Sequence, residues 1–344
     1  MCLLNKNGGE VMKSITMADI AKETGYSVNT ISHALNDKSD ISEKTKEYIR
    51  ETAEKMGYIR NISASALRSG KSKSVAVIVG DISNPHFSVM IKEIEAKLRE
   101  YDYTAIILNT DEDEKREKKA IVSAIEKNVD GIIICPVQKT EKNIKYLEKN
   151  GIKHILIGRR FAKDDENYVV CDDENGGFEA ADYFLKKGCR KILFLNGPLH
   201  ISGAKERLIG IKSAFAKNKV ELSHMKAETV TISNFGGNME IQEIIQQNSD
   251  ADAVICFSDL IGMEACRCII NQGRKIPEEV EVIGFDNIAS KFSFPMLLSS
   301  VTASKTYMSE KAVELLMSAI NGERQKEGIV LPTKLVLRET TKER

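Results

Sequence analysis

The segment from Val28 to His33 carries side chains that can hydrogen-bond to the edges of nucleic-acid bases. Val28, Asn29, Ser32 and His33 recur at spacings of one, three and four, so a helix would place them on one face. The amide, hydroxyl and imidazole groups in this set supply both donors and acceptors. Such a face suits the direct reading of bases in a major groove. A small helical hairpin with a merely polar surface would show the same pattern.

The surrounding residues predict two short helices that hold this face in place. The first helix spans residues 17–23, with Ile20 and Ala21 facing inward. Gly25 supplies a tight turn because it accepts positive φ without steric cost, and the Ser27 hydroxyl can cap the second helix. The second helix directs its apolar side chains into the same small core: Ile31, Ala34 and Leu35. This arrangement is a helix-turn-helix.

A third helix is expected after a loop over residues 37–41. Ser42 is its N-cap, and Ile49, Ala53 and Met56 form an apolar stripe at spacings of four and three. Three helices in about 45 residues bury little surface, so this domain should be only marginally stable by itself.

Two segments flank the helical domain of residues 12–60. Residues 1–11 are interpreted as a disordered or mis-assigned extension, on the hypothesis that synthesis starts at Met12. Residues 61–73 connect the helices to the body, and the stretch 60–73 contains four basic and no acidic residues although the formal net charge of the chain is zero. That local charge suits contacts with phosphates. The segment is either a plain linker or a helix that forms only when docked, because so short a helix does not persist alone in water.

From residue 74 onward, apolar strand-like runs alternate with helical patterns. The runs cover residues 75–79, 104–108, 131–135, 154–158, 191–196, 253–257 and 280–284. Continuous β-branched strands separated by helices predict parallel sheets that are covered on both faces. About 270 residues of this pattern exceed one doubly wound sheet, so we expect two similar subdomains that face each other across a cleft.

Several kinds of chemistry have no support in the sequence. Neither a GxGxxG after the first strand nor a GxxxxGK[ST] occurs, and no catalytic order of Ser, His and Asp or of Cys and His stands out. The five His lack metal-ligand spacing, and seven scattered Cys without a CxxC argue against a disulfide framework. No run approaches the 18 or so apolar residues that a membrane span needs. We therefore expect a reduced cytosolic protein that uses no metal or cofactor.

The chain resembles the lactose/galactose-repressor family of bacterial transcription regulators from Met12 to about Thr341. The resemblance rests on motifs in the family's order: ADIAKETGYSVNTISHALN, GYIRNISASALRSGKS, DISNPHF, VDGIIICP, NGP followed by ERLIG, FSD, IPEEVEVIGFDN and LVLRET. It implies an all-α helix-turn-helix domain of three helices plus a hinge helix, followed by an α/β body like that of periplasmic sugar-binding proteins. It also implies two doubly wound subdomains, one of residues 74–186 and 304–331 and the other of residues 187–303 and 332–344.

By the same resemblance, the contacts with DNA fall on the helix-turn-helix and the hinge. Val28, Asn29 and His33 match the family's main major-groove positions. His33 stands where arginine is common; it offers weaker, pH-dependent bonding to a guanine edge, or else contacts only a phosphate. Leu67 matches a leucine that wedges into the minor groove and kinks the duplex. The expected DNA-binding residues are Met17, Ser27, Val28, Asn29, Thr30, Ser32, His33, Asn36, Asn61, Ala64 and Leu67.

The resemblance likewise implies an effector cleft between the subdomains. His86 and Phe87 follow the first strand, at the end where open α/β sheets place ligands, and Arg and Asp side chains can bond sugar hydroxyls or a carboxylate. The expected effector-binding residues are His86, Phe87, Asp172 (with Asp173 as the alternative), Arg207, Phe235, Asp259 and Asp286. Open alternatives are a helix-surface ion pair for Arg207, a capping role for Asp259 or Asp286, and simple packing for His86 and Phe87.

These implications together predict a repressor that binds a near-palindromic double-stranded DNA operator under the control of a small, sugar-like effector. A homodimer is expected, because the chain ends at Arg344 without the leucine-heptad helix that joins dimers in some family members. The rival interpretations are a solute-binding protein without regulatory function and a cytosolic sugar or nucleotide enzyme. The helix-turn-helix and the missing secretory signal argue against the first, and the missing catalytic constellation argues against the second.

Overall fold

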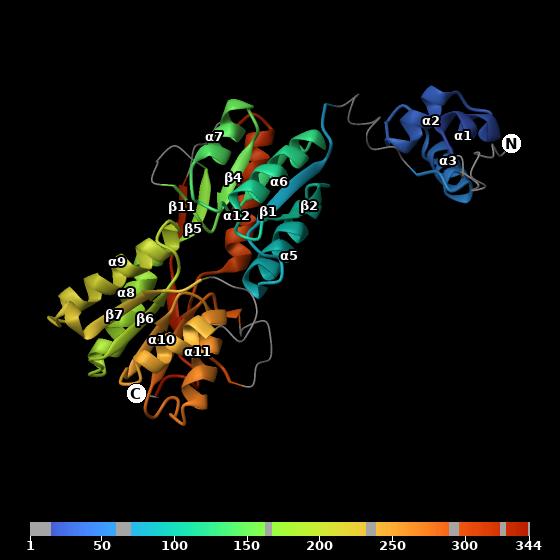
Figure 1. Ribbon diagram of the computed structural model, residues 1–344. Coiled ribbons are helices and arrows are strands. Elements are labelled where there is room, and N and C mark those ends of the chain that lie inside the picture. Colours follow the sequence, from blue (N-terminus) through green and yellow to red (C-terminus); the bar gives the residue numbers. More distant parts are fainter. Residues whose placement is uncertain are drawn as a thin grey trace, which may run out of the picture. The chain divides into compact units, whose positions relative to one another are not determined.

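The computed structural model describes residues 15–59, 70–161, 167–231, 239–288, 296–323 and 328–342. The chain divides into two compact units, Met1–Gly70 and Lys71–Arg344, and Figure 1 shows the elements of each. The predicted extension of residues 1–11 and most of the predicted hinge lie outside the described residues.

The described part of the first unit consists of three short helices, α1 (Met17–Thr24), α2 (Val28–Leu35) and α3 (Glu43–Lys55). All three contribute to one small core, whose buried members are Ile20, Ile31, Ala34, Ile49 and Ala53. Gly25, between α1 and α2, has a φ of +77°, a conformation that residues with a Cβ rarely adopt. The predicted helix-turn-helix is therefore confirmed.

Side-chain caps fix the start of each of these helices. Thr16 and Asp19 form a capping box on α1, in which the Thr16 N–H donates to Asp19 Oδ2 at 2.8 Å and the Asp19 N–H donates to Thr16 Oγ1 at 3.3 Å. Ser27 Oγ accepts from the Thr30 N–H at 3.1 Å, and Ser42 caps α3 in the same way. Ser27 and Ser42 are the caps that the sequence predicts.

The described part of the second unit contains two six-stranded sheets with helices on both faces (Figure 1). The strand orders are β11-β5-β4-β3-β1-β2 and β12-β10-β9-β8-β6-β7. Neighbouring strands run parallel, except that β12 is antiparallel to β10. The predicted pair of parallel-sheet subdomains is therefore confirmed.

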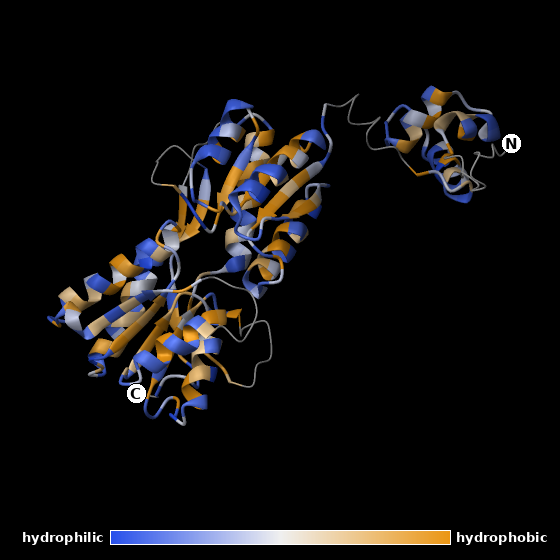
Figure 2. Cartoon of the chain, in the orientation of Figure 1, coloured by the Kyte–Doolittle hydropathy of each residue, from blue (hydrophilic) through white to orange (hydrophobic). Residues whose placement is uncertain are grey.

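The first subdomain is built on the first sheet. It consists of β1 (Ser74–Val79), α5 (Pro85–Arg99), β2 (Thr104–Asn109), α6 (Glu114–Glu126), β3 (Gly131–Ile134), α7 (Lys142–Lys149), β4 (His154–Ile157), β5 (Tyr168–Cys171), α12 (Lys305–Ile320) and β11 (Gly328–Leu331). Alternate residues of β1 pack on opposite layers: Val75 and Val77 face α5 and α12, whereas Ala76 and Ile78 face α6 and α7. This is why the strand is apolar from Val75 to Val79, and Figure 2 colours most of it as hydrophobic.

The second subdomain repeats this design on the second sheet. It consists of α8 (Asp173–Lys186), β6 (Ile192–Asn196), α9 (Ser202–Lys217), the 3-10 helix η1 (Leu222–His224), β7 (Met225–Thr229), α10 (Met239–Gln247), β8 (Ala253–Cys256), α11 (Asp259–Asn271), β9 (Glu281–Phe285), β10 (Ser299–Thr302) and β12 (Lys334–Val336). Helices α8 and α9 cover one face of the sheet, and α10 and α11 cover the other.

The predicted division of the body is wrong for α8. The sequence placed residues 74–186 in the first subdomain, but α8 packs on α9 and on the second sheet, where Phe184 lies in the same core as Phe194. The chain therefore crosses between subdomains at residues 171–173. It crosses again at residues 302–305 and 331–334, between β10 and α12 and between β11 and β12. None of the described helices combines the length and the apolar content that crossing a bilayer requires.

Candidate functional site

Helix α2 exposes the amino-terminal part of the predicted base-reading face. The side chain of Val28 is 48% exposed and Asn29 is exposed as well, while His33 is half-buried. Thr30 is also half-buried, and its hydroxyl lies 2.8 Å from Ser27 Oγ. The accessible groups at the start of α2 are therefore an apolar side chain and an amide, with an imidazole one turn further along.

Other expected DNA-binding residues have contacts within the helical unit. Ser32 is only 6% exposed, so its predicted place on the outer face is wrong; the buried side of α2 extends from Ile31 to its neighbour Ser32. Asn36 donates its Nδ2–H to the Ser32 carbonyl at 2.6 Å, and half-buried Met17 packs on the helical core. The hinge residues Asn61, Ala64 and Leu67 lie outside the described residues.

His33 has an acidic partner that the sequence did not single out. Its Nδ1 lies 2.6 Å from Oδ2 of Asp40, in the loop after α2. The hydrogen bond from the imidazole holds the pKa of the Asp40 carboxyl below its usual value. The orientation of a candidate base-reading side chain is thus fixed from within the protein.

The body anchors the residues that lead from the hinge segment. Both carboxylate oxygens of Asp130, just before β3, accept backbone N–H groups, from Ser72 at 2.7 Å and from Lys73 at 3.0 Å. Lys71 Nζ donates to Asn321 Oδ1 at 3.2 Å. These bonds attach residues 71–73 to the first subdomain.

In the second unit, a cavity of about 20 Å³ lies where the chain crosses between the subdomains. Its described wall consists of His86, Cys171, Asp173, Arg207, Phe285, Asp286, Val301, Thr302, Ala303, Lys305, Met308 and Thr333. Each of the three crossings contributes to this wall. The cavity therefore shares its wall with all three segments that connect the subdomains.

The centre of this wall is the side chain of Asp286, which follows β9. Its Oδ1 lies 3.1 Å from Nδ1 of His86 on α5, and Lys305 Nζ donates to its carbonyl oxygen. Burial alone would raise the pKa of Asp286, but His86, together with Arg207 and Lys305, holds it well below its usual range. Asp286 also has a φ of +96°, a costly conformation that tends to occur at functional sites.

Arg207 occupies the second-subdomain side of the wall. Its Nε donates to Asp173 Oδ1 at 2.8 Å, and its guanidinium carbon lies 4.1 Å from the ring centroid of Phe285 and 4.7 Å from that of Phe257. The backbone of α9 carries this side chain close to α8, since a Cβ on Gly177 would lie 2.2 Å from the Arg207 carbonyl oxygen. The guanidinium is thereby held between a carboxylate and two aromatic rings.

The remaining residues that were expected to bind the effector lie in different places in the structure. Asp172 caps α8 by accepting from the Asn175 N–H at 3.0 Å, so the alternative, Asp173, is the aspartate that reaches the cavity. Phe87 lies in the core of the first subdomain and contacts the His86 ring edge-on, with centroids 5.2 Å apart. Phe235 lies outside the described residues.

Asp259 lies behind the cavity wall and is 1% exposed. Its carboxylate accepts from the Ile288 N–H at 2.8 Å and from the Ser300 hydroxyl at 2.6 Å. Burial, and then the nearby charge of Asp286, raise the pKa of Asp259 to about 7. Asp259 thus ties the loop after β9, which carries Asp286, to β10.

Sequence reasoning missed several members of the cavity wall. Phe285 and Lys305 are the most important of these, because one packs on the Arg207 guanidinium and the other bonds to Asp286. Phe285 could have been found from its position in the sequence. It directly follows the predicted strand of residues 280–284 and closes β9, so it lies at the carboxyl edge of the sheet, where such folds bind ligands.

A second set of bonds joins the subdomains beside α9. The Ser202 N–H, at the start of α9, donates to Gln138 Oε1 at 3.0 Å. Arg160 Nη2 lies 3.2 Å from Glu206 Oε1. Gln138 and Arg160 belong to loops of the first subdomain, so these bonds would have to break or rearrange in any large opening of the cleft.

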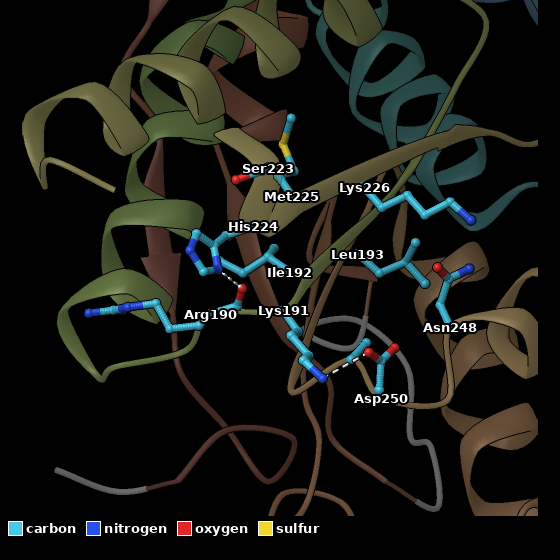
Figure 3. Close-up of a pocket in the computed structure, with 11 residues that line it drawn as sticks. Arg190, Lys191, Ile192, Leu193, Ser223, His224, Met225, Lys226, Asn248 and Asp250 are labelled. Atoms are coloured by element: carbon cyan, nitrogen blue, oxygen red, sulfur yellow. Dashed lines mark hydrogen bonds and ion pairs between the residues drawn. The ribbon is translucent and has the colours of Figure 1, made fainter. Parts of the chain in front are cut away.

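A larger pocket elsewhere in the second unit is a weaker candidate for a ligand site. It has a volume of about 300 Å³ and lies at the amino ends of β6, β7 and β8 (Figure 3). Figure 3 shows two interactions among its polar groups: Lys191 Nζ lies 2.9 Å from Asp250 Oδ2, and His224 Nδ1 lies 2.8 Å from the Arg190 carbonyl oxygen. Parallel sheets bind ligands at the opposite end. In the part of the chain that the structure describes, no group of three or more His, Cys, Asp or Glu is placed to hold a metal ion.

Comparisons with known proteins cover nearly the whole chain. Residues 16–61 match the family model for "Bacterial regulatory proteins, lacI family", and residues 72–338 match that for "Periplasmic binding proteins and sugar binding domain of LacI family". The HTH-type transcriptional regulator DegA of Bacillus subtilis (strain 168) is 29% identical over 331 residues, which cover 95% of this chain and 98% of that protein.

Two solved structures extend this likeness to three dimensions. The lac repressor dimer bound to operator and the anti-inducer ONPF has a TM-score of 0.83 at 20% identity, and the match covers 96% of this chain and 99% of that chain. A periplasmic binding protein/LacI transcriptional regulator from Alkaliphilus metalliredigens, complexed with D-xylulofuranose, has a TM-score of 0.68 at 26% identity and covers 79% of this chain and 100% of that one.

Proposed function

We propose, on the premise that the chain belongs to the lacI family of bacterial regulatory proteins, that its affinity for an operator is controlled by a small molecule in the cleft. The family comprises DNA-binding transcriptional regulators rather than enzymes. The observation that carries the proposal is the cavity whose wall holds Asp286, Arg207 and all three crossings between the subdomains.

The DNA-binding half of the proposal rests on α2. Its amino-terminal end is capped by Ser27, and it exposes Val28 and Asn29, the part of a second helix that meets base edges in a major groove. Two copies related by two-fold symmetry would read a near-palindromic operator, so we infer that the regulator acts as a homodimer. Its place of action is then the bacterial cytoplasm, at the chromosome.

The chemistry of the cavity favours a sugar or a sugar derivative. Carboxylates of Asp286 and Asp173 accept hydrogen bonds from hydroxyl groups, the Arg207 guanidinium donates, and Phe285 offers an apolar ring. The lining thus combines fixed donors and acceptors with an aromatic surface, as small-molecule sites do.

The size of the cavity suggests how binding is coupled to movement. About 20 Å³ accommodates a water molecule but no sugar, so an effector has to widen the cleft or displace side chains. Widening acts on the three crossings and on the first subdomain, to which Asp130 attaches Ser72 and Lys73. These residues are the last two of the proposed hinge segment of residues 61–73, so the change can reach the DNA-binding unit. Couplings of this kind are on the order of 1–3 kcal/mol, or 5–150-fold in affinity.

Two linked experiments test the proposal. Selection of duplexes from a random pool by the full chain should recover a near-palindromic sequence. A thermal-shift screen of sugars and nucleobases should then find a stabilising compound, because a ligand that binds only the native state stabilises it by mass action. Recovery of no preferred duplex would contradict the DNA-binding half, and a stabilising compound that leaves operator affinity unchanged would contradict the control.

A further inference from the structure

The loop after α2 brings an acidic side chain back to the candidate base-reading face. Asp40 Oδ2 lies 2.6 Å from His33 Nδ1, and the two side chains are 56% and 35% exposed. The pKa of the Asp40 carboxyl is held below its usual value by this hydrogen bond, so the group is ionised at neutral pH. An ionised carboxylate can only accept. Nδ1 of His33 must therefore carry the proton of this bond.

This protonation leaves Nε2 as the ring nitrogen available to a ligand. Within the described residues, Nε2 of His33 has no hydrogen-bond partner. In a neutral imidazole with its proton on Nδ1, Nε2 is an acceptor. Adenine and cytosine present exocyclic amines as donors in the major groove, whereas guanine presents two acceptors. A fixed acceptor at His33 favours an amine over the guanine edge that the sequence suggested.

We propose that Asp40 is a positioning residue that holds His33 in one orientation and one tautomer, and thereby sets the base preference at one operator position. This inference rests on the proposed operator binding. Without the Asp40 carboxylate the imidazole can turn and either nitrogen can carry the proton, so one base pair is no longer favoured over the others.

The negative charge of Asp40 allows its positioning of His33 to be distinguished from a general electrostatic effect on the affinity for DNA. A carboxylate beside DNA opposes the approach of phosphates. Removal of Asp40 should therefore raise the affinity for all duplexes while it lowers the discrimination at one position. A residue that only stabilised the fold would lower the affinity for all duplexes and leave the preference unchanged.

The same loop offers a matched control. The Asp37 carboxylate pairs with Arg50 at 2.9 Å and with Lys46 at 3.0 Å, both on α3. Its pKa is lowered by these partners, Lys46 first, so it is also ionised. Asp37→Ala removes the same charge from the same loop without removing a partner of His33.

The test selects duplexes from a pool randomised over one half-site, with the full chain carrying no change, His33→Ala, Asp40→Ala, Asp40→Asn or Asp37→Ala. We expect the unchanged chain to favour one base pair at one position by about 10-fold. His33→Ala and Asp40→Ala should reduce this to about 2-fold at the same position. Asp40→Asn should lower the preference less than Asp40→Ala does, because its amide still contacts Nδ1 but can either accept from it or donate to it and so fixes no tautomer. Asp37→Ala should retain the full preference.

Nitrogen-15 spectra of the labelled full chain without DNA give an independent measurement. They should show the proton on Nδ1 of His33, and Asp40→Ala should shift the ring to a mixture of tautomers. The inference is overturned if Asp40→Ala keeps the full preference, if it affects a different position from His33→Ala, or if Nδ1 carries no proton. Failure of the unchanged chain to select any sequence would overturn the proposed function too, whereas these other outcomes overturn the positioning role alone.

Discussion

Asp286 Oδ1 lies 3.1 Å from His86 Nδ1, so a carboxylate of the second subdomain faces an imidazole of the first. The two groups are not aligned as a hydrogen bond, and His86 Nδ1 is buried without a hydrogen-bond partner among the described residues. An unsatisfied buried polar atom is costly, and such atoms need an explanation. We expect a ligand hydroxyl to satisfy this one, because it can bond to the nitrogen and to the carboxylate at once. Under the proposed function, the pair would link effector binding to the contact between the subdomains.

The first prediction concerns Arg207. Arg207→Lys keeps a positive charge but loses the planar fork that faces Asp173, so we expect the affinity for the effector to fall at least about 10-fold. Operator affinity without effector should stay within about 2-fold. Calorimetric titration with the stabilising compound measures the first quantity, and a duplex titration measures the second. Arg267→Lys is the control, since Arg267 pairs with Glu264 on the surface of α11. An unchanged effector affinity in Arg207→Lys would remove this residue from the site.

Asp259 predicts a dependence of stability on pH. Its pKa is about 7 in the folded chain and about 3.9 in an unfolded one, so between these values the folded state retains a proton that the unfolded state releases. The free energy of unfolding should therefore fall as pH rises from about 4 to 7, by at most about 1.4 kcal/mol per pH unit from this group.

Urea titrations at several pH values measure this slope. Asp259→Asn should flatten the profile of the second unit over that range. Asp250→Asn, which changes an exposed carboxylate paired with Lys191, should leave the profile nearly as it was. Identical slopes in all three chains would contradict the assignment.

The local rules of helix formation made the first unit predictable. Gly25, Ser27 and Ser42 each determine a turn or a cap within four residues of sequence, and the structure has all three where they were expected. Ser32 was misplaced because helical spacing gives the direction of a side chain but not the width of the surface that neighbouring helices cover. The partner of His33 was missed because it lies seven residues away, in a loop without a repeating pattern.

The body was predictable in its buried strands and less so elsewhere. Apolar runs identified the strands with helices on both faces, such as β1 and β8. The edge strand β7 has mostly exposed side chains, and β10 is rich in Ser and Thr, so neither shows such a run. The boundary at α8 was misjudged because the change of subdomain occurs within residues 171–173, with no Gly- or Pro-rich linker to mark it.

The structure assigns Ser27 a capping role that can be separated from any contact with DNA. Ser27→Ala removes the acceptor for the Thr30 N–H and should destabilise the first unit by about 1 kcal/mol, whereas Ser27→Asn keeps a cap. Hydrogen exchange of the α2 amides in the full chain measures this difference directly. Equal protection in both variants would show that the cap contributes nothing. If Ser27→Asn is as stable as the unchanged chain and still binds operator weakly, Ser27 also contacts DNA.

Asp130 offers a test of how the body controls the hinge segment. Asp130→Ala releases the N–H groups of Ser72 and Lys73. We therefore expect the coupling free energy between effector binding and operator binding to fall to less than half of its value in the unchanged chain. Effector affinity itself should stay nearly constant because Asp130 is not part of the cavity wall. Asp113→Ala is a matched control, since Asp113 also accepts a backbone N–H, from Arg116 at 2.8 Å, but only caps α6. Full coupling in Asp130→Ala would show that control reaches DNA by another path.

The most direct test of the account is an equilibrium titration of the selected operator with the full chain, with and without a saturating amount of the stabilising compound. We expect the compound to shift the midpoint by 5–150-fold in the unchanged chain, and to shift it by a smaller factor in Arg207→Lys at the same concentration. A midpoint that is the same with and without the compound, or an operator bound no better than a random duplex, would contradict the account.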